Sequence, residues 1–161
     1  MLKLSLEHRD QLHKHACDCY PEECCGLMLG HQTSDDIQVV QLWSTENSWT
    51  ADFLNSDSLE TELSSASSAK KASRLNRFAI APIKILRAQK YARSKNLDIV
   101  GIYHSHPDHP AVPSEYDRKI AWQQYSYLIM SVTARSVEKT LSWRLTEDHQ
   151  FRSEPLAFAP Q

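Results

Sequence analysis

The sequence predicts an α/β fold in which helices flank one mixed β-sheet. Apolar runs of strand length alternate with segments of helical period along most of the chain, an order typical of layered α/β proteins. The length of 161 residues fits the usual size of one domain, about 100–200 residues. Hydrophobic residues make up 41% of the chain and charged residues 24%, which allows a sizeable core. We therefore expect residues 1–161 to form a single domain.

The N-terminal elements are a helix and two strands. Ser5 is placed to cap a helix that runs to about Tyr20, where Pro21 ends it. An apolar run at residues 24–30, bounded by glycine, predicts a buried strand, and residues 37–43 are rich in β-forming side chains. We expect these two strands to pair as a hairpin across a polar turn.

Residues of about 50–77 differ in composition from their flanks. They are rich in serine, contain no glycine or proline and carry few large apolar side chains. A segment of this kind contributes little to a core. We expect a Ser-rich insertion, mobile or weakly helical, with residues 59–75 as the candidate helix.

The C-terminal half alternates helices and strands. Pro82 suits the first turn of a helix that ends near Asn96. A proline-rich loop at residues 107–113 then precedes a helix that starts at Ser114 and runs through Trp122. Trp122 and Trp143 lie in amphipathic elements, so we expect both in the core. The predicted strands are residues 78–80, 99–104, 125–133 and 140–146, with a final extended piece around Phe151.

Charge and hydropathy exclude several classes of protein. The 18 basic and 20 acidic residues give a net charge of −2, so the chain has no basic footprint for nucleic acid and no polybasic membrane anchor. The longest apolar stretches, such as residues 127–132, are far short of the ~20 residues that cross a bilayer. The N-terminus becomes charged by Glu7, too early for a secretory signal.

The cysteines predict a reducing compartment. All four lie close to the N-terminus, and the adjacent pair Cys24 and Cys25 cannot bridge each other without strain. No Cys-x-x-Cys pair is present, which argues against a thiolate zinc ribbon or a thioredoxin-like motif. We expect buried free thiols and a cytoplasmic protein.

The densest set of chemically capable side chains lies at residues 103–117. His104 and His106 are two apart at the end of a predicted strand, and alternation along a strand puts both imidazoles on one face. Two imidazoles on one face form half of a tetrahedral zinc site. Taken alone, the pair is also compatible with strand residues that are hydrogen-bonded at a surface.

Asp117 is the natural third ligand, because the stiff proline-rich loop folds the next helix back towards the histidines. Ser114 and Asp117 are three apart and share a helix face. The same Ser-x-x-Asp pattern is also a capping box, which needs no chemistry. The combination of a one-face histidine pair and a one-face Ser/Asp pair, joined by a short loop, favours a metal site.

The spacing of these residues resembles the JAMM signature of the MPN-plus metalloprotease family. The matching residues are His104, Ser105 and His106, then Ser114 after seven residues and Asp117 after two more. Residues 21–30 look like the family's upstream element, an acidic residue before an apolar Gly-Leu strand. The resemblance is to compact bacterial members and runs from Leu4 to about Leu145. It implies an MPN fold, cytidine-deaminase-like, around one mixed sheet.

The resemblance implies one zinc ion per chain, with His104, His106 and Asp117 as ligands. A carboxylate must then take a proton from water and hand it to the leaving amine. Glu22 and Glu23 are both candidates, and neighbouring side chains on an extended chain point opposite ways. The family pattern selects Glu23 as catalytic and gives Ser114 the role of a hydrogen-bond donor to the oxyanion.

The resemblance also implies a substrate class, a small ubiquitin-like or sulfur-carrier protein with a Gly-Gly tail. Compact bacterial members hydrolyse the bond after the carrier's C-terminal glycine, for example to release cysteine from a carrier adduct. The alternatives are a metallopeptidase on other short peptides and a non-catalytic MPN scaffold, although scaffolds typically lose ligands that this chain keeps. A base deaminase would need His-x-Glu and Pro-Cys-x-x-Cys, which do not occur. The sequence makes no prediction of the oligomeric state.

Other polar residues receive structural interpretations. Cys25 is expected in core packing, Asp108 in a turn and His109 in an exposed loop. The histidines of the first predicted helix have no acidic or thiolate partner spaced for a metal, and we expect them at the surface. These are His8, His13 and His15.

Overall fold

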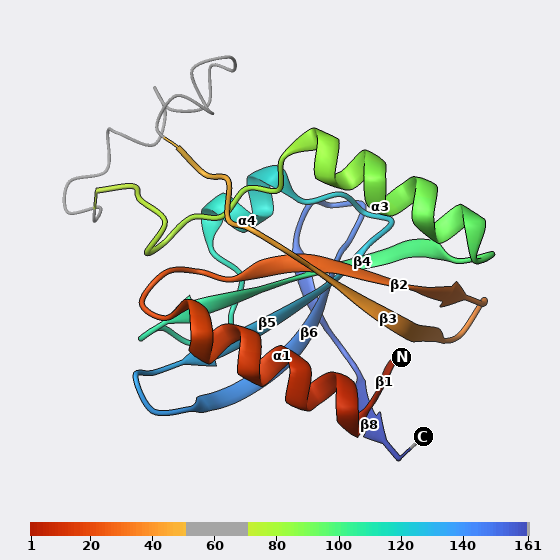
Figure 1. Ribbon diagram of the computed structural model, residues 1–161, viewed down its shortest axis with the longest axis horizontal. Helices are drawn as coiled ribbons and strands as arrows, with labels where there is room; N and C mark the ends of the chain where they lie inside the picture. The colour runs from red at the N-terminus through yellow and green to blue at the C-terminus, as the bar shows by residue number, and fades with distance from the viewer. Residues whose placement is uncertain (51–70, 161) are drawn as a thin grey trace.

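The computed structural model describes residues 1–50 and 71–160, which contain one mixed eight-stranded sheet and three helices (Figure 1). The strand order across the sheet is β7-β6-β5-β4-β2-β3-β1-β8. In chain order the elements are β1 (Leu2–Ser5), α1 (Leu6–Cys19), β2 (Cys25–Gln32), β3 (Ile37–Thr45), α3 (Pro82–Ser94), β4 (Asp98–Pro107), α4 (Glu115–Ile120), β5 (Ser126–Val132), β6 (Val137–Leu145), β7 (Phe151–Glu154) and β8 (Leu156–Ala159). The predicted α/β class, a mixed sheet with flanking helices, is confirmed.

The centre of the sheet is formed by β5, β4 and β2. β2 pairs antiparallel with both β3 and β4, and β4 pairs parallel with β5. Most of their residues are buried, as expected of strands that are covered on both faces. Cys25 of β2 lies opposite His104 of β4. The start of β2 and the end of β4 therefore meet, and the chemically capable residues gather at this junction.

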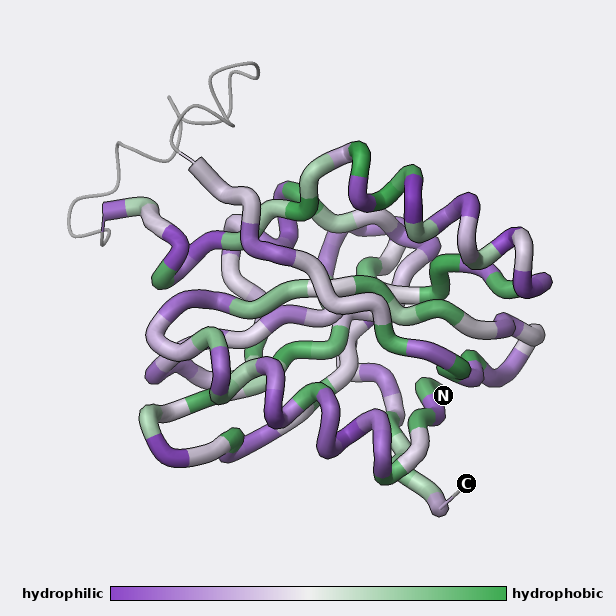
Figure 2. Tube along the Cα trace, viewed as in Figure 1, coloured by the Kyte–Doolittle hydropathy of each residue, from purple (hydrophilic) through white to green (hydrophobic). Residues whose placement is uncertain are grey.

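Two helices cover opposite faces of the central strands. Leu12 of α1 shares a core with Met28 of β2, whereas Ala88 of α3 shares a second core with the neighbouring Leu27. Alternation of side chains along β2 therefore supplies both cores. Figure 2 shows apolar residues along the central strands and hydrophilic residues over much of α1. No helix within the described ranges has the length and apolarity that crossing a membrane would require.

The N-terminal strand β1 was not predicted. It pairs in parallel with β8 and, through Leu2 and Lys3, with the start of β3. Four residues are too few to show a clear alternation. Ser5 ends this strand and also caps α1, as predicted.

The prediction that His8 lies at the surface is wrong, because it is 6% exposed. His8 is the third residue of α1, and its backbone N–H donates to the Ser5 hydroxyl at 3.0 Å. Its ring Nδ1 accepts from the Ser5 backbone N–H at 3.3 Å. A histidine thus completes the capping box in the place usually taken by glutamate or glutamine. The ring is buried because it folds back to the Ser5 backbone. His13 and His15 are half-buried.

The predicted strand at residues 78–80 is also wrong. This stretch has no strand pairing, because side-chain and loop groups use its backbone. Ser48 donates its backbone N–H to the Ala79 carbonyl at 2.9 Å, and the Ala79 N–H donates to the Asn47 side chain at 3.2 Å. Phe78 and Ala79 are nevertheless buried, so their apolar character is used for packing.

The two tryptophans differ from their predicted burial. α4 ends at Ile120, and Trp122 beyond it is 63% exposed, so its place in the core was predicted wrongly. The chain turns extended at Ala121, which removes Trp122 from the buried face of the helix. Trp143 is half-buried, and its indole N–H donates to the Ala111 carbonyl at 3.0 Å.

The predicted insertion at about 50–77 lies mostly outside the described residues. Its described part, residues 71–77, forms a turn and no helix. Within it the Asn76 side chain accepts from the Ser73 N–H at 3.0 Å, and the Ser73 hydroxyl accepts from the Leu75 N–H at 3.3 Å. Such local side-chain bonds compete with helical hydrogen bonding. Residues 71–75, the described end of the candidate helix at 59–75, are therefore not helical.

Candidate metal centre

Two histidines at the end of β4 face the same way, as the alternation of a strand requires. His104 and His106 are buried, and their Nε2 atoms lie 3.0 Å apart. β4 holds this end rigidly, since it pairs with β2 on one side and with β5 on the other. The two imidazoles therefore lie on one face of β4, as the two-residue period of a strand predicted.

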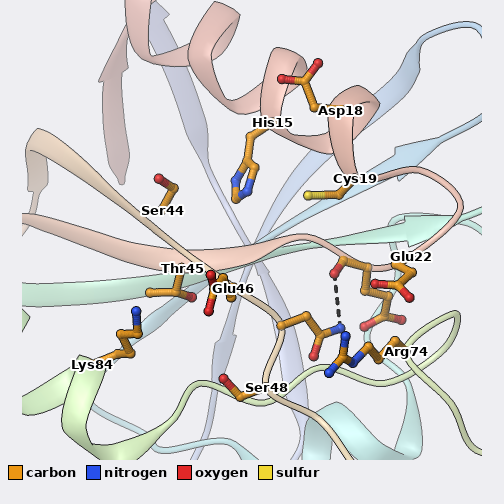
Figure 3. A pocket seen from close by; sticks show the side chains of 12 residues that line it. His15, Asp18, Cys19, Glu22, Ser44, Thr45, Glu46, Ser48, Arg74 and Lys84 are labelled. Atoms are coloured by element: carbon orange, nitrogen blue, oxygen red, sulfur yellow. Dashed lines mark hydrogen bonds between the residues drawn. The ribbon is translucent and has the colours of Figure 1, made fainter.

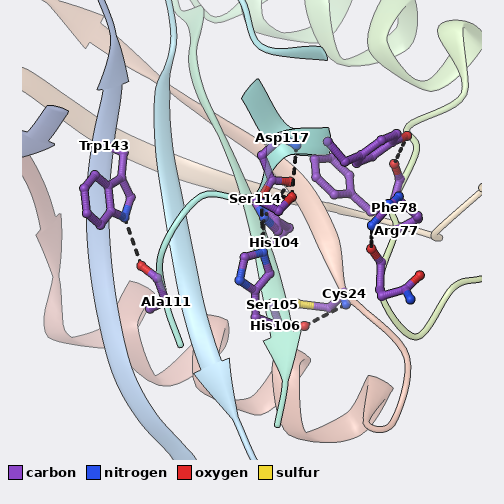
Figure 4. Close-up of polar contacts among 12 residues, drawn as sticks. Cys24, Arg77, Phe78, His104, Ser105, His106, Ala111, Ser114, Asp117 and Trp143 are labelled. Atoms are coloured by element: carbon purple, nitrogen blue, oxygen red, sulfur yellow. Dashed lines mark hydrogen bonds and ion pairs between the residues drawn. The ribbon is translucent and has the colours of Figure 1, made fainter. Parts of the chain in front are cut away.

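Asp117 brings its carboxylate to both rings from α4. Oδ1 lies 3.3 Å from Nε2 of His104, and Oδ2 lies 3.3 Å from Nε2 of His106 (Figure 4). One ligand atom from each of the three residues lies within 4.8 Å of the others, in a fully buried group. The loop between β4 and α4 therefore returns the chain to the histidines.

The donor set fits a divalent metal ion. Nδ1 of His106 lies 2.9 Å from the Pro110 carbonyl; because a carbonyl only accepts, this nitrogen carries the proton and Nε2 keeps its lone pair. That lone pair, Nε2 of His104 and the Asp117 carboxylate all point to one place. Two imidazoles and one carboxylate are ligands that zinc accepts, and three protein ligands leave a fourth position for water or substrate.

The two histidines are oriented by different contacts. His106 has its hydrogen bond to Pro110, which is the usual outer contact of a metal-binding imidazole. The His104 ring instead stacks on Phe78, with centroids 4.4 Å apart and planes at 23°. Its Nδ1 is buried and has no hydrogen-bond partner among the described residues.

The charges of His104, His106 and Asp117 shift one another's pKa values. Burial acts to raise the pKa of Asp117, but the two imidazoles outweigh it and hold that pKa well below its usual range. Burial acts to lower the pKa of His106, but the hydrogen bond and charge of Asp117 outweigh it and raise that pKa. For His104 burial dominates and lowers the pKa. A deprotonated carboxylate is thus ready to hold a cation.

Ser114 performs the capping role that the sequence offered as an alternative. Its hydroxyl accepts from the Asp117 backbone N–H at 3.1 Å and donates to the Asp117 carboxylate at 2.7 Å. The Ser114 backbone N–H donates to the same carboxylate at 2.6 Å. The helix cap at Ser114 therefore orients the carboxylate of Asp117, which together with His104 and His106 forms the metal group.

Glu23 lies just before β2 and is 5% exposed, whereas Glu22 is exposed. Burial raises the pKa of Glu23 to about 8, although the nearby charges of His106 and Arg77 oppose this shift. A buried carboxyl with a pKa near neutrality can both accept and return a proton. Among the two neighbouring glutamates, only Glu23 lies in this environment.

Two residues hold Glu23 in place; from the sequence, Ser105 was named only as part of the signature and Asn47 was not named. The Ser105 hydroxyl accepts from the Cys24 backbone N–H at 2.8 Å, which ties the chain next to Glu23 to β4. The Asn47 side chain donates to the Glu23 carbonyl at 3.1 Å and to the Arg77 carbonyl at 2.9 Å. Alternation along β4 could have assigned Ser105 to the face opposite the histidines, but nothing local marks Asn47.

Other candidate residues have structural roles. Cys25 is buried, and burial raises the pKa of its thiol to about 12, so it is no nucleophile. Asp108 adopts a φ of 55° and accepts from the Tyr20 hydroxyl at 2.9 Å, in keeping with a turn. His109 is exposed. All four cysteines are free thiols, but only Cys24 and Cys25 are buried as expected, whereas Cys19 is half-buried and Cys17 is exposed.

A polar cleft of about 1010 Å³ opens beside Glu23. Figure 3 shows His15 entering it from α1, Lys84 from α3 and Arg74 from the chain before α3, and Asp18 of α1 also lines it. Its remaining lining residues are Cys19, Glu22, Glu23, Ser44, Thr45, Glu46, Asn47 and Ser48. The site thus combines a buried group of metal-ligating side chains with an open approach.

This combination defines a candidate metal centre, and comparison with known proteins gives the family of the chain. A model of the prokaryotic homologues of the JAB domain matches residues 5–146, and the chain belongs to this family. The family resemblance inferred from the sequence is thereby confirmed.

Two solved structures and one further protein are similar to this chain. The solution structure of a Salinibacter ruber protein has a TM-score of 0.66 and 31% identity, covering 99% of this chain and 92% of that one. The solution structure of a Desulfitobacterium hafniense protein is similar in fold, with a TM-score of 0.75 and 24% identity over 100% of this chain and 94% of that one. A Thermus thermophilus protein named "Probable TtuB-protein conjugate cleaving protease" is 39% identical over 55 residues, which span 34% of this chain and 37% of that protein.

Proposed function

We propose that the protein is a zinc-dependent peptidase or isopeptidase that hydrolyses the bond after the C-terminal glycine of a small ubiquitin-like or sulfur-carrier protein. The observation that carries this proposal is the buried convergence of His104, His106 and Asp117 beside the buried carboxyl of Glu23. In this proposal each chain holds one zinc ion. The four free thiols suit a reducing compartment, and we place the protein in the cytoplasm.

Zinc bound by the three ligands would supply Lewis acidity and lower the pKa of a water molecule to ~7. Glu23 accepts the proton of the attacking water and returns it to the leaving amine, and its raised pKa suits both transfers. In the structure the one O–H of Ser114 donates to the Asp117 carboxylate; in its catalytic role Ser114 would turn this O–H to a developing oxyanion. Asn47 and Ser105 hold the Glu23 backbone during these transfers.

The carrier substrate is supported by two considerations. The Thermus thermophilus relative is named for cleaving conjugates of a protein, TtuB. Independently, the metal ligands are deeply buried, so the residues next to the scissile bond must be slim to approach them. Glycine has no Cβ to obstruct this approach, and a Gly-Gly tail on a folded carrier meets the demand.

The experiment is mass spectrometry of two substrates after incubation with zinc-loaded protein. One is a carrier–cysteine adduct and the other is a carrier joined through an isopeptide bond. We expect at least one to be cut after the terminal glycine, with loss of cleavage on chelation and in Glu23→Gln. Cleavage of unrelated peptides without glycine, and of neither carrier substrate, would support the general metallopeptidase instead. Absence of all cleavage by zinc-loaded protein would favour the scaffold.

A further inference from the structure

The strand that borders the cleft has an open edge. β3 pairs with β2 along its whole length, but β1 meets its other edge only at Ile37 and Gln38. From Gln41 to Thr45 that edge has no strand partner among the described residues. Unpaired N–H and C=O groups of an edge strand are a template for an added strand.

The open edge leads towards the metal centre. Ser44, Thr45 and Glu46 line the same cleft as Glu23. A second hollow of about 310 Å³, which includes Leu42 and Tyr103, shares His15, Asp18 and Ser44 with the cleft. The two hollows therefore form one groove that follows β3 away from Glu23. Residues 42–46 span about 16 Å in an extended conformation, room for roughly five residues of an added strand.

The charges of this groove do not select a strongly charged ligand. Acidic Asp18, Glu22 and Glu46 stand against basic Arg74 and Lys84 in the cleft. At the other end Lys14 and Asp18 are paired with each other at 2.6 Å. Recognition here therefore depends on the backbone of the ligand more than on its charge.

His15 adds an oriented hydrogen-bond donor to the groove. Its Nδ1 lies 3.0 Å from the hydroxyl of Tyr103, a buried residue. This hydroxyl hydrogen-bonds with His15 alone among the described residues, and a buried O–H without an acceptor is costly. The hydroxyl must therefore donate to Nδ1, which leaves the proton of a neutral imidazole on Nε2. Figure 3 shows the ring pointing from α1 into the cleft.

We propose that His15 and the open edge of β3 together bind an extended polypeptide segment of the substrate, which runs along residues 42–46 towards Glu23. Nε2–H of His15 donates to a backbone carbonyl of this segment, and the β3 edge pairs with its backbone as an added strand. This inference rests on the proposed function and specifies how that substrate is held. His15 is a binding residue, and it takes no part in the proton transfers.

The kinetic test compares two histidines of one helix. His13 also lies on α1, but its ring contacts Thr140 of β6 at 3.1 Å and does not line the groove. With the carrier–cysteine adduct, His15→Ala should raise KM about 2- to 12-fold, the range of one net hydrogen bond, with kcat unchanged. His15→Gln should raise KM less than His15→Ala, because the glutamine amide N–H can donate. His13→Ala should leave both constants unchanged. An unchanged KM in His15→Ala would overturn the proposal.

A binding measurement separates this inference from the proposed function. The zinc-loaded Glu23→Gln variant is titrated with free carrier ending in Gly-Gly, and its backbone amide resonances are followed by NMR. We expect shifts in residues 42–46 that weaken when His15→Ala is added and when the carrier lacks its last six residues. Such shifts without hydrolysis by the wild type would uphold the groove and reject the reaction. Hydrolysis without shifts on β3 would reject the groove and keep the reaction.

Discussion

The metal group and the groove beside it are built in opposite ways. In the metal group every side chain is buried, and Asp117 and His106 are each fixed by a further hydrogen bond. In the groove the lining residues Asp18, Glu22 and Ser44 are exposed. Chemistry requires fixed donor atoms in a dry place, whereas an extended ligand requires an accessible backbone edge. We therefore expect changes in the first region to act on metal binding and turnover, and changes in the second to act on substrate affinity.

The largest effect is expected from the metal ligands. His104→Ala combined with His106→Ala, or Asp117→Asn alone, removes donor atoms from a three-ligand site. We expect loss of zinc, measured by elemental analysis of the purified protein, together with loss of hydrolysis. The exposed Asp108 offers a control, because Asp108→Asn changes a nearby carboxylate outside the ligand group. Undiminished zinc in the double-histidine variant would contradict the assignment.

Glu23→Gln separates the metal from the proton transfer. The amide keeps the shape of the side chain but cannot accept the proton, so we expect kcat to fall about 10²- to 10⁴-fold with zinc content retained. Glu22→Gln is the matched control, since that neighbouring carboxyl is exposed. Both variants are assayed for turnover and zinc. Loss of turnover in Glu22→Gln alone would mean that the two glutamates have been given each other's roles.

The same pair of glutamates gives a pH test in the metal-free protein. Burial raises the pKa of Glu23 to about 8 from 4.5, so its charged form is disfavoured in the folded state. Its contribution to stability is present below pH 4.5 and is lost as the pH rises through 8. Glu23→Gln avoids this loss and should be the more stable protein at pH 9, by on the order of 3–5 kcal/mol.

Chemical denaturation at pH 5 and at pH 9, in the presence of a chelator, measures this difference. The gap between Glu23→Gln and the wild type should widen from pH 5 to pH 9. Glu22→Gln should follow the wild type at both values, because its carboxyl is exposed. A gap that is equal at the two pH values would show that burial of Glu23 does not penalise its charge.

A smaller effect is expected from the residue that joins the two elements of the site. Ser105→Ala leaves the Cys24 backbone N–H without its 2.8 Å acceptor, in a buried place. We expect a loss of about 1–3 kcal/mol in the free energy of unfolding and slower turnover with zinc retained. Ser131→Ala on β5, opposite His106 in the register, is the control. Equal losses of stability in the two variants would show that the hydrogen bond from Cys24 to Ser105 does not stabilise the site.

The sequence predicted the buried metal ligands, but it did not predict the open groove beside them. The ligands His104 and His106 follow from a strand period, and Asp117 from the start of a helix, because both signals are local. Glu23 was distinguished from Glu22 by the family pattern, and the structure adds the difference in burial. Asn47 and His15 act through contacts with distant parts of the chain, with Arg77 and Tyr103, and no local pattern marks them.

The fold shows the same limit. Strands with long apolar runs, such as β2 and β4, were predicted because burial on both faces leaves a continuous signal. β1 and Trp122 were misjudged for a shared reason. Both depend on where a short element ends, and each end is set by a partner outside that element. For β1 the partner is the distant β8, and for Trp122 it is the Tyr127 hydroxyl, which accepts from the Trp122 backbone N–H at 2.6 Å.

The pairing of β1 with β8 also fixes an order of assembly. Leu2 lies opposite Leu156, so this edge of the sheet joins residues that a ribosome makes near the beginning and near the end of the described chain. The three residues of the metal group and Glu23 all precede β8 in synthesis. Pairings between such distant residues form slowly. The residues for chemistry are therefore complete in the nascent chain before the edge made by β1 and β8 can close.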